Sequence, residues 1–123
     1  MVDYSQIEKI LISEIKLTSI QAKILLLVVA EGKMSAKQIS EKLQVSVNEA
    51  SDNSKDLIEM GAFIDMPNNE FESMHPRFIA VNMYRKICER EKIEFKKNLT
   101  VDNIGVSLEK PYDDARTKYN KSK

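Results

Sequence analysis

The sequence of 123 residues predicts a mainly helical domain that carries one short β-hairpin. Apolar residues recur three and four positions apart along most of the chain, which is the spacing of amphipathic helices. Glycine and proline occur only three times each, too few for an all-β protein with many tight turns. Turn-forming residues are concentrated at 67–69, between two short segments with the composition of strands.

The first two predicted helices lie at the start of the chain. Apolar residues at helical spacing predict a short amphipathic helix over 4–16. Thr18 and Gln21 have the spacing of a capping box, which marks the start of a second helix over about 19–31. This segment is apolar on nearly every side, so we expect it to be the central buried helix, ended by Gly32.

The next two predicted helices are separated by a break of three to four residues. Ser35 is a suitable N-cap for the first of them, and Ile39 and Leu43 lie on one face of it. Ser46 is a suitable N-cap for the second, which we expect over about 47–60. Two short helices with such a break between them are typical of a helix-turn-helix.

A hairpin and a long helix are predicted next. Residues 62–66 and 70–74 have the composition of strands, and two strands at this place form a wing beside the helix-turn-helix. His75-Pro76 marks the start of a helix over about 76–97, because proline fits the first helical turn.

The end of the chain allows two interpretations. Apolar residues three and four apart favour a helix over about 101–119, kinked near Pro111. Alternating apolar residues within 98–110 also fit a strand, so both alternatives stay open. The sequence therefore predicts a winged helix-turn-helix domain over 1–76 and a C-terminal helical extension over 77–123.

The helical stripe of this extension has no evident partner within a domain of this size. An isolated helix of such a length is marginal in water, so we expect the stripe to pack against a second copy in a homodimer. The residues of this expected dimer contact are Ile104, Leu108, Tyr112, Ala115 and Tyr119.

Several short motifs occur in order between residues 17 and 85. They are Leu17-Thr18, Ala22-Lys23 before a leucine run, Ser35-Ala36 with Ile39, Leu57 before Gly61, and Phe71 followed by His75-Pro76. Through them this block resembles the N-terminal winged-helix domain of the TrmB-like transcriptional regulators. The resemblance implies DNA binding and a homodimer joined through C-terminal helices. Full-length members of that family add an effector-binding domain for sugars, which we do not expect within these 123 residues.

The predicted recognition helix departs from the pattern of that family. It contains no arginine, and Ser51 stands where the family has an aromatic residue. At 100° per residue its outward face carries Asn48, Asp52, Lys55 and Glu59, flanked by Glu49 and Asp56. With one base and four acids, this face has a net negative charge and repels a row of phosphates. Contact with DNA therefore requires cations nearby.

We expect base contacts from the first two turns of this helix and phosphate contacts from cations around it. Asn48 can pair with adenine, and Asp52 or Glu49 can accept a hydrogen bond from cytosine N4. The predicted DNA-binding residues are Lys37, Gln38, Ser46, Asn48, Ser51, Lys55 and Arg77. The sequence thus predicts a homodimeric transcription regulator that binds double-stranded DNA. The alternative is a winged-helix module that binds another protein through its acidic third helix.

Composition argues against other classes of function. One cysteine and one histidine exclude an intramolecular disulfide and the usual transition-metal sites, and we expect no cofactor. The three glycines lie far apart and no catalytic set has a sequence signature, so we do not expect an enzyme. The longest apolar run, 24–30, is too short to span a membrane, and no secretion signal opens the chain. We therefore expect a cytoplasmic protein.

The net charge of zero conceals an uneven distribution. Residues 1–84 carry 8 Lys+Arg and 12 Asp+Glu, whereas residues 85–123 carry 11 and 7. The C-terminal third is the basic part, with the mixed charges that solvated helix surfaces have. If the third helix is not the working surface, this third is the next place to seek contacts with nucleic acid, through Lys96, Lys97, Arg116 and Lys118.

Overall fold

The computed structural model describes the backbone of residues 3–121 and the side chains of residues 3–117. Its helices are α1 (Tyr4–Glu14), α2 (Ser19–Glu31), α3 (Ala36–Leu43), α4 (Val47–Glu59), α5 (Pro76–Glu91) and α6 (Leu99–Lys121). Its strands are β1 (Met34–Ser35), β2 (Phe63–Met66) and β3 (Glu70–Ser73). The predicted fold class is confirmed: the protein is a mainly helical winged helix-turn-helix.

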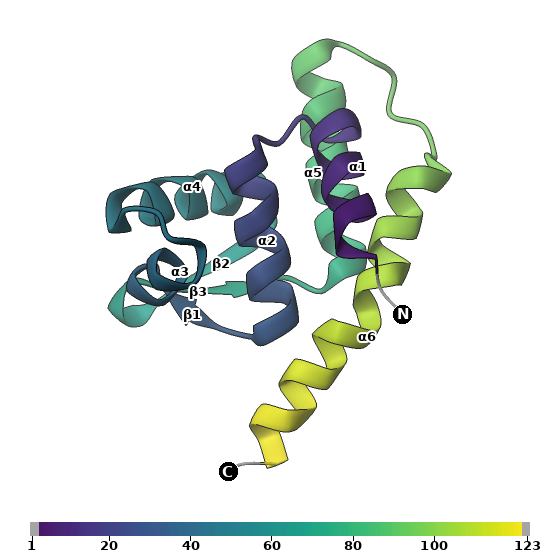
Figure 1. Ribbon diagram of the computed structural model, residues 1–123. Coiled ribbons are helices and arrows are strands. Elements are labelled where there is room, and N and C mark those ends of the chain that lie inside the picture. The colour runs from purple at the N-terminus through teal and green to yellow at the C-terminus, as the bar shows by residue number, and fades with distance from the viewer. Residues whose placement is uncertain (1–2, 122–123) are drawn as a thin grey trace.

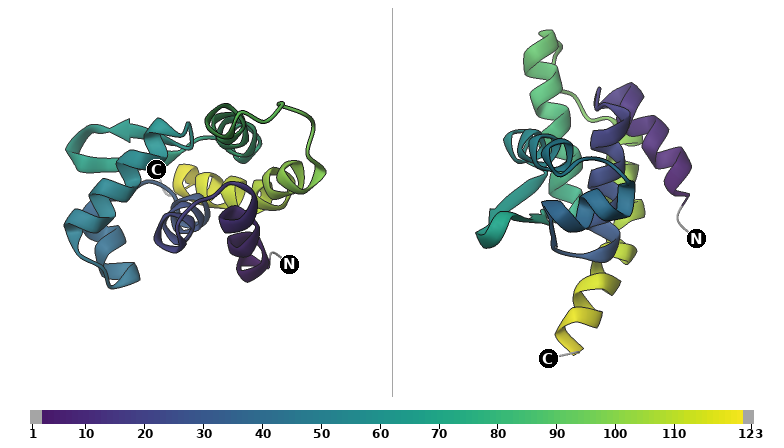
Figure 2. Two further views of the ribbon diagram at one scale, coloured as in Figure 1. Left: turned by 90° about the horizontal axis from the view of Figure 1, so that it is seen from above. Right: turned by 60° about the vertical axis from the view of Figure 1, so that its left-hand side comes forward.

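The helices and the sheet are arranged around α2 (Figure 1). The helix-turn-helix pair α3 and α4 and the small sheet lie on one side of α2, and α1, α5 and α6 lie on the other (Figures 1 and 2). The strands form an antiparallel sheet in the order β1-β3-β2. In the wing, Phe63 of β2 pairs with Ser73 of β3, and Met66 pairs with Glu70. Both predicted wing strands are confirmed.

The sequence does not predict β1, because a strand of two residues shows no alternation. Met34 pairs with Phe71 and so adds a short third strand to the free edge of β3. At the tip of the wing, Asn68 and Asn69 have φ angles of 65° and 57°. Asparagine tolerates this left-handed conformation better than most residues, which explains its place in the turn.

The starts of the three central helices follow the capping residues that the sequence predicts. The Thr18 hydroxyl accepts a hydrogen bond from the Gln21 backbone N–H at 3.2 Å, and the Gln21 side chain accepts one from the Thr18 N–H at 3.1 Å. Ser35 and Gln38 form the same capping box at the start of α3. The Ser46 hydroxyl accepts from a backbone N–H of α4 at 3.0 Å. These caps fix the directions in which α2, α3 and α4 leave their turns.

The core lies between α2 and the elements on its two sides. Ile24 and Leu25 of α2 are fully buried, as are Leu57 of α4 and Ile39 of α3. Leu26 of α2 and Phe63 of β2 are buried in the same core, and Leu43 of α3 is half-buried against it.

The two C-terminal helices differ in how well the sequence predicts them. α5 ends at Glu91, earlier than expected, because Lys92 takes a left-handed φ of 55°. α6 begins at Leu99, continues through residue 110 and includes Pro111, so the helical alternative is confirmed and the strand alternative is wrong.

The stripe on α6 packs mainly within the same chain. Ile104 and Leu108 are buried in the core that α6 shares with α2 and α5. The expectation that these two residues lack a partner in their own domain is therefore wrong, because α6 folds back on it. The rest of the stripe comprises Tyr112 and Ala115, which are half-buried, and Tyr119, whose side chain lies outside the described residues.

Gly105 explains how closely α6 crosses the start of α5. A Cβ atom at this position would lie 3.1 Å from the Pro76 carbonyl oxygen and 3.1 Å from the Arg77 Cα atom. Glycine is a poor helix former, but here the missing side chain lets the two helix backbones approach. The same approach brings the Arg77 guanidinium to Glu109 of α6, with which it forms an ion pair.

Candidate nucleic-acid interface

α4 presents one face to the core and the other to solvent. Ala50, Ser54 and Leu57 are fully buried, and Asn53 beside them is half-buried. The outward residues Asn48, Asp52, Lys55, Glu59, Glu49 and Asp56 are all exposed. Burial of three side chains at helical spacing fixes the rotation of α4, so its polar face points away from the core.

Most of the predicted DNA-binding residues lie together on α3 and α4. Lys37 is exposed in the first turn of α3, and Asn48 and Lys55 are exposed on α4, with the half-buried Ser51 between them. Gln38 and Ser46 are exposed as well, but their side chains already cap α3 and α4.

Arg77 does not lie with the others. It belongs to the first turn of α5, where its guanidinium pairs with Glu109, on the other side of α2 from α4 (Figure 1). His75 caps this turn, with its Nδ1 atom accepting a hydrogen bond from the Arg77 N–H at 3.2 Å. The few residues between β3 and Arg77 suggest a place beside the wing, but the chain turns at Pro76 and carries the side chain to α6.

The surface of the helix-turn-helix and the wing is acidic. Residues 36–74 contain three lysines and eight Asp+Glu. Lys42 forms an ion pair with Glu31 at 3.4 Å, and Asp56 accepts a hydrogen bond from the Gln21 side chain at 3.2 Å. Within residues 3–121, neither Lys37 nor Lys55 forms an ion pair, so these two cations are the ones available to phosphates beside α4.

Arg116 has a structural place that the sequence does not reveal. Its guanidinium donates to the Val29 carbonyl oxygen at 2.6 Å, at the C-terminal end of α2, and pairs with Glu72 of β3. It also lies over the Tyr112 ring, with 3.9 Å between the guanidinium carbon and the ring centroid. A positive charge at a helix C-terminus is favourable, so Arg116 fastens α6 to α2 and to the wing. It is therefore not available as a surface contact for nucleic acid.

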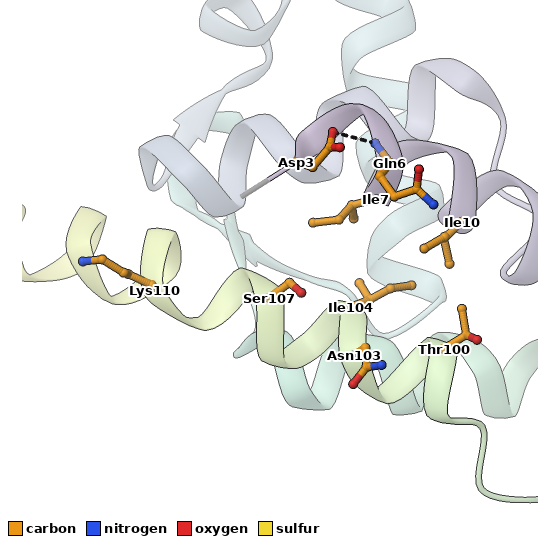
Figure 3. A pocket seen from close by; sticks show the side chains of 9 residues that line it. All are labelled: Asp3, Gln6, Ile7, Ile10, Thr100, Asn103, Ile104, Ser107 and Lys110. Carbon is orange, nitrogen blue, oxygen red and sulfur yellow. Dashed lines mark hydrogen bonds between the residues drawn. The ribbon is translucent and has the colours of Figure 1, made fainter. Parts of the chain in front are cut away.

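A cavity of about 520 Å³ lies between α1 and α6, away from α4. Figure 3 shows Ile7 and Ile10 of α1 facing Ile104 of α6 across it, with polar side chains such as Asn103 along its edge.

Among residues 3–121, no three or more His, Cys, Asp or Glu side chains gather as they would around a metal ion. In the same part of the chain, no helix is both long enough and apolar enough to cross a membrane.

A comparison with solved structures supports this fold. No family model matches the chain, and no curated protein matches it. Among solved structures, the chain is similar to TrmBL2, described as an archaeal chromatin protein whose structure shows a novel mode of DNA binding. The TM-score is 0.64 at 18% sequence identity, and the match covers 73% of this chain and 35% of TrmBL2. The chain thus spans about a third of that protein, with which it shares the fold that the resemblance to TrmB-like regulators implies.

Proposed function

We propose that this protein binds double-stranded DNA as a homodimeric transcription regulator of the TrmB-like type. In this proposal α4 enters the major groove, and the wing lies along the phosphate backbone. The observation that carries it is the orientation of α4, in which Ala50, Ser54 and Leu57 are fully buried while Asn48 and Lys55 are exposed on the outer face. The structural similarity to TrmBL2, a DNA-binding protein, supports it.

The side chains of α4 can read bases as well as contact phosphates. The Asn48 amide can donate to and accept from an adenine edge, and Asp52 can accept from cytosine N4. Lys55 and Lys37 supply positive charge for the backbone. Because acids outnumber bases on this surface, we expect α4 alone to bind with modest affinity and, with only two cations beside it, with a shallow dependence on salt.

The homodimer needs a surface other than Ile104 and Leu108, because both are buried within one chain. A two-fold dimer would place two α4 helices at a fixed spacing, which would set the separation of two half-sites on the DNA.

A second function is favoured by the acidity of the same surface. Eight acids against three bases over residues 36–74 suit a basic protein partner better than a polyanion. In that case α4 would dock on protein, and the chain would have no affinity for DNA.

An aspartate double variant on α4 tests the proposed function. Asp52→Asn with Asp56→Asn removes two negative charges that face the phosphates, so binding to any duplex should tighten. The matched control is Asp113→Asn with Asp114→Asn on α6, where both residues are also exposed. Fluorescence anisotropy with a labelled random duplex measures both.

Equal tightening by the control would show an effect of net charge alone and would contradict contact through α4. No binding of the unmodified protein at low salt would favour the protein-binding module.

A further inference from the structure

The most basic part of the described surface lies at the far end of α5 and in the turn that follows. Residues 85–97 contain six Lys+Arg and three Asp+Glu, a balance of +3, and every one of these side chains is exposed. The bases are Arg85, Lys86, Arg90, Lys92, Lys96 and Lys97, and the acids are Glu89, Glu91 and Glu94. We call residues 85–97 the basic end. Residues 36–74, which form the helix-turn-helix and the wing, have a charge balance of −5. The positive charge of the molecule therefore lies mainly away from α4 and the wing.

The basic end has a defined local structure. Lys92 terminates α5 in the left-handed conformation, and the Ile93 N–H donates to the Cys88 carbonyl oxygen at 2.9 Å, which turns the chain back over the helix end. The ring of Phe95 then packs on Tyr84, with 5.9 Å between the ring centroids. The Arg85 guanidinium lies over the Phe95 ring, with 5.1 Å between the guanidinium carbon and the ring centroid. Lys96 and Lys97 follow Phe95 directly in the chain.

The basic end lies apart from the wing. Figure 1 shows α5 projecting at the top of the molecule, on the other side of α2 from α3 and the sheet, and the right-hand view of Figure 2 shows the same projection. The end is therefore accessible to a large partner.

We propose that the basic end is a second contact surface for the backbone of double-stranded DNA. This inference rests on the proposed function and adds a site to it. Most affinity for duplex DNA comes from cations that neutralise phosphates and release counterions. Lys37 and Lys55 are too few for this role, and the basic end supplies the missing charge. Sequence would be read at α4, while the basic end would hold the duplex without regard to sequence.

The salt dependence of binding separates the two surfaces. Each phosphate contact contributes about −0.9 to the slope of log affinity against log salt, so Lys37 and Lys55 alone give a slope of about −1.8 per chain. The proposal predicts a steeper slope than this. Because the additional contacts are to backbone, they should act alike on every sequence.

The test compares two double variants of the full chain on one labelled random duplex. Lys96→Gln with Lys97→Gln removes two charges from the basic end. Lys9→Gln with Lys110→Gln removes the same charge from α1 and α6, where both lysines are exposed and lie away from α4 and the wing. The first variant should lose about 1.8 units of salt slope and bind every duplex more weakly, whereas the control should keep the slope of the unmodified protein. Thermal melting verifies that both variants are folded.

The possible outcomes are distinct. If the unmodified protein binds and the first variant keeps its salt slope, the basic end is not a DNA surface, although the proposed function stands. Equal losses in both variants would show a net-charge effect and overturn the inference. If the unmodified protein does not bind duplex at all, both the proposed function and this inference are wrong. Equally tight binding of polyglutamate would identify a surface for acidic proteins and contradict the assignment to DNA.

Discussion

Leu57 is the residue through which α4 packs on the core. It is fully buried beneath α4. Leu57→Ala should lower the free energy of unfolding by roughly 2–5 kcal/mol, because a large side chain is removed from a packed site. Urea denaturation measures the change. The control, Lys55→Ala on the exposed face of the same helix, should stay within about 0.5 kcal/mol. If Leu57→Ala lowers the free energy of unfolding by less than about 0.5 kcal/mol, the stability of the domain does not depend on the packing of Leu57.

Gly105 offers a test in which helix propensity and packing act in opposite directions. Alanine is the better helix former by about 1 kcal/mol. Its Cβ would nevertheless meet the backbone of Pro76 and Arg77 at 3.1 Å, and backbone atoms at a helix start cannot easily move. We therefore expect Gly105→Ala to lower the melting temperature, while Ser107→Ala at an exposed position of α6 leaves it unchanged or raises it. A stabilised Gly105→Ala protein would mean that the crossing is looser than described.

Residue roles that depend on local spacing could be predicted from the sequence, and those that depend on distant partners could not. The caps at Thr18, Ser35 and Ser46 and the exposed face of α4 follow from positions within a few residues of one another. Arg77 and Arg116 meet Glu109 and Glu72, which lie 32 and 44 residues away along the chain. No periodicity connects such pairs, so both arginines look like surface cations in the sequence.

Among the helices and strands, α6 is the one whose role in the structure differs most from the role that the sequence predicts. Its helical spacing is visible in the sequence, but the same spacing suits a partner in another chain or in the same one. The absence of a side chain at Gly105 and the ion pair at Arg116 decide the matter, because they let α6 lie along α5 and α2. Removal of all residues after Lys97 should therefore destabilise the domain rather than release a folded monomer.

Arg116 provides the corresponding prediction for α6. Arg116→Ala leaves Glu72 and the Val29 carbonyl without their partner, so the domain should lose roughly 1–3 kcal/mol of stability. Hydrogen exchange should rise in the last turns of α6 and stay low near Leu108. Lys110→Ala removes another paired cation of the same helix, but an exposed one, and should change little. Unchanged exchange in Arg116→Ala would show that Arg116 does not fasten the helix.

At the scale of the whole molecule, the proposal requires two copies. Sedimentation equilibrium of the full chain at micromolar concentration should give the mass of a dimer, because two linked α4 helices are needed to read two half-sites. A monomer under these conditions would contradict the dimer and leave a single recognition helix.

The uneven charge of the molecule decides whether it binds DNA, and the salt dependence of binding to a random duplex measures this most directly. The acidic α4 surface repels the phosphates of a duplex, whereas the basic end attracts them. We predict measurable binding of the unmodified protein at low salt, with a log–log slope steeper than about −1.8 for each chain. The absence of binding at the lowest salt at which the protein stays dissolved would contradict the account.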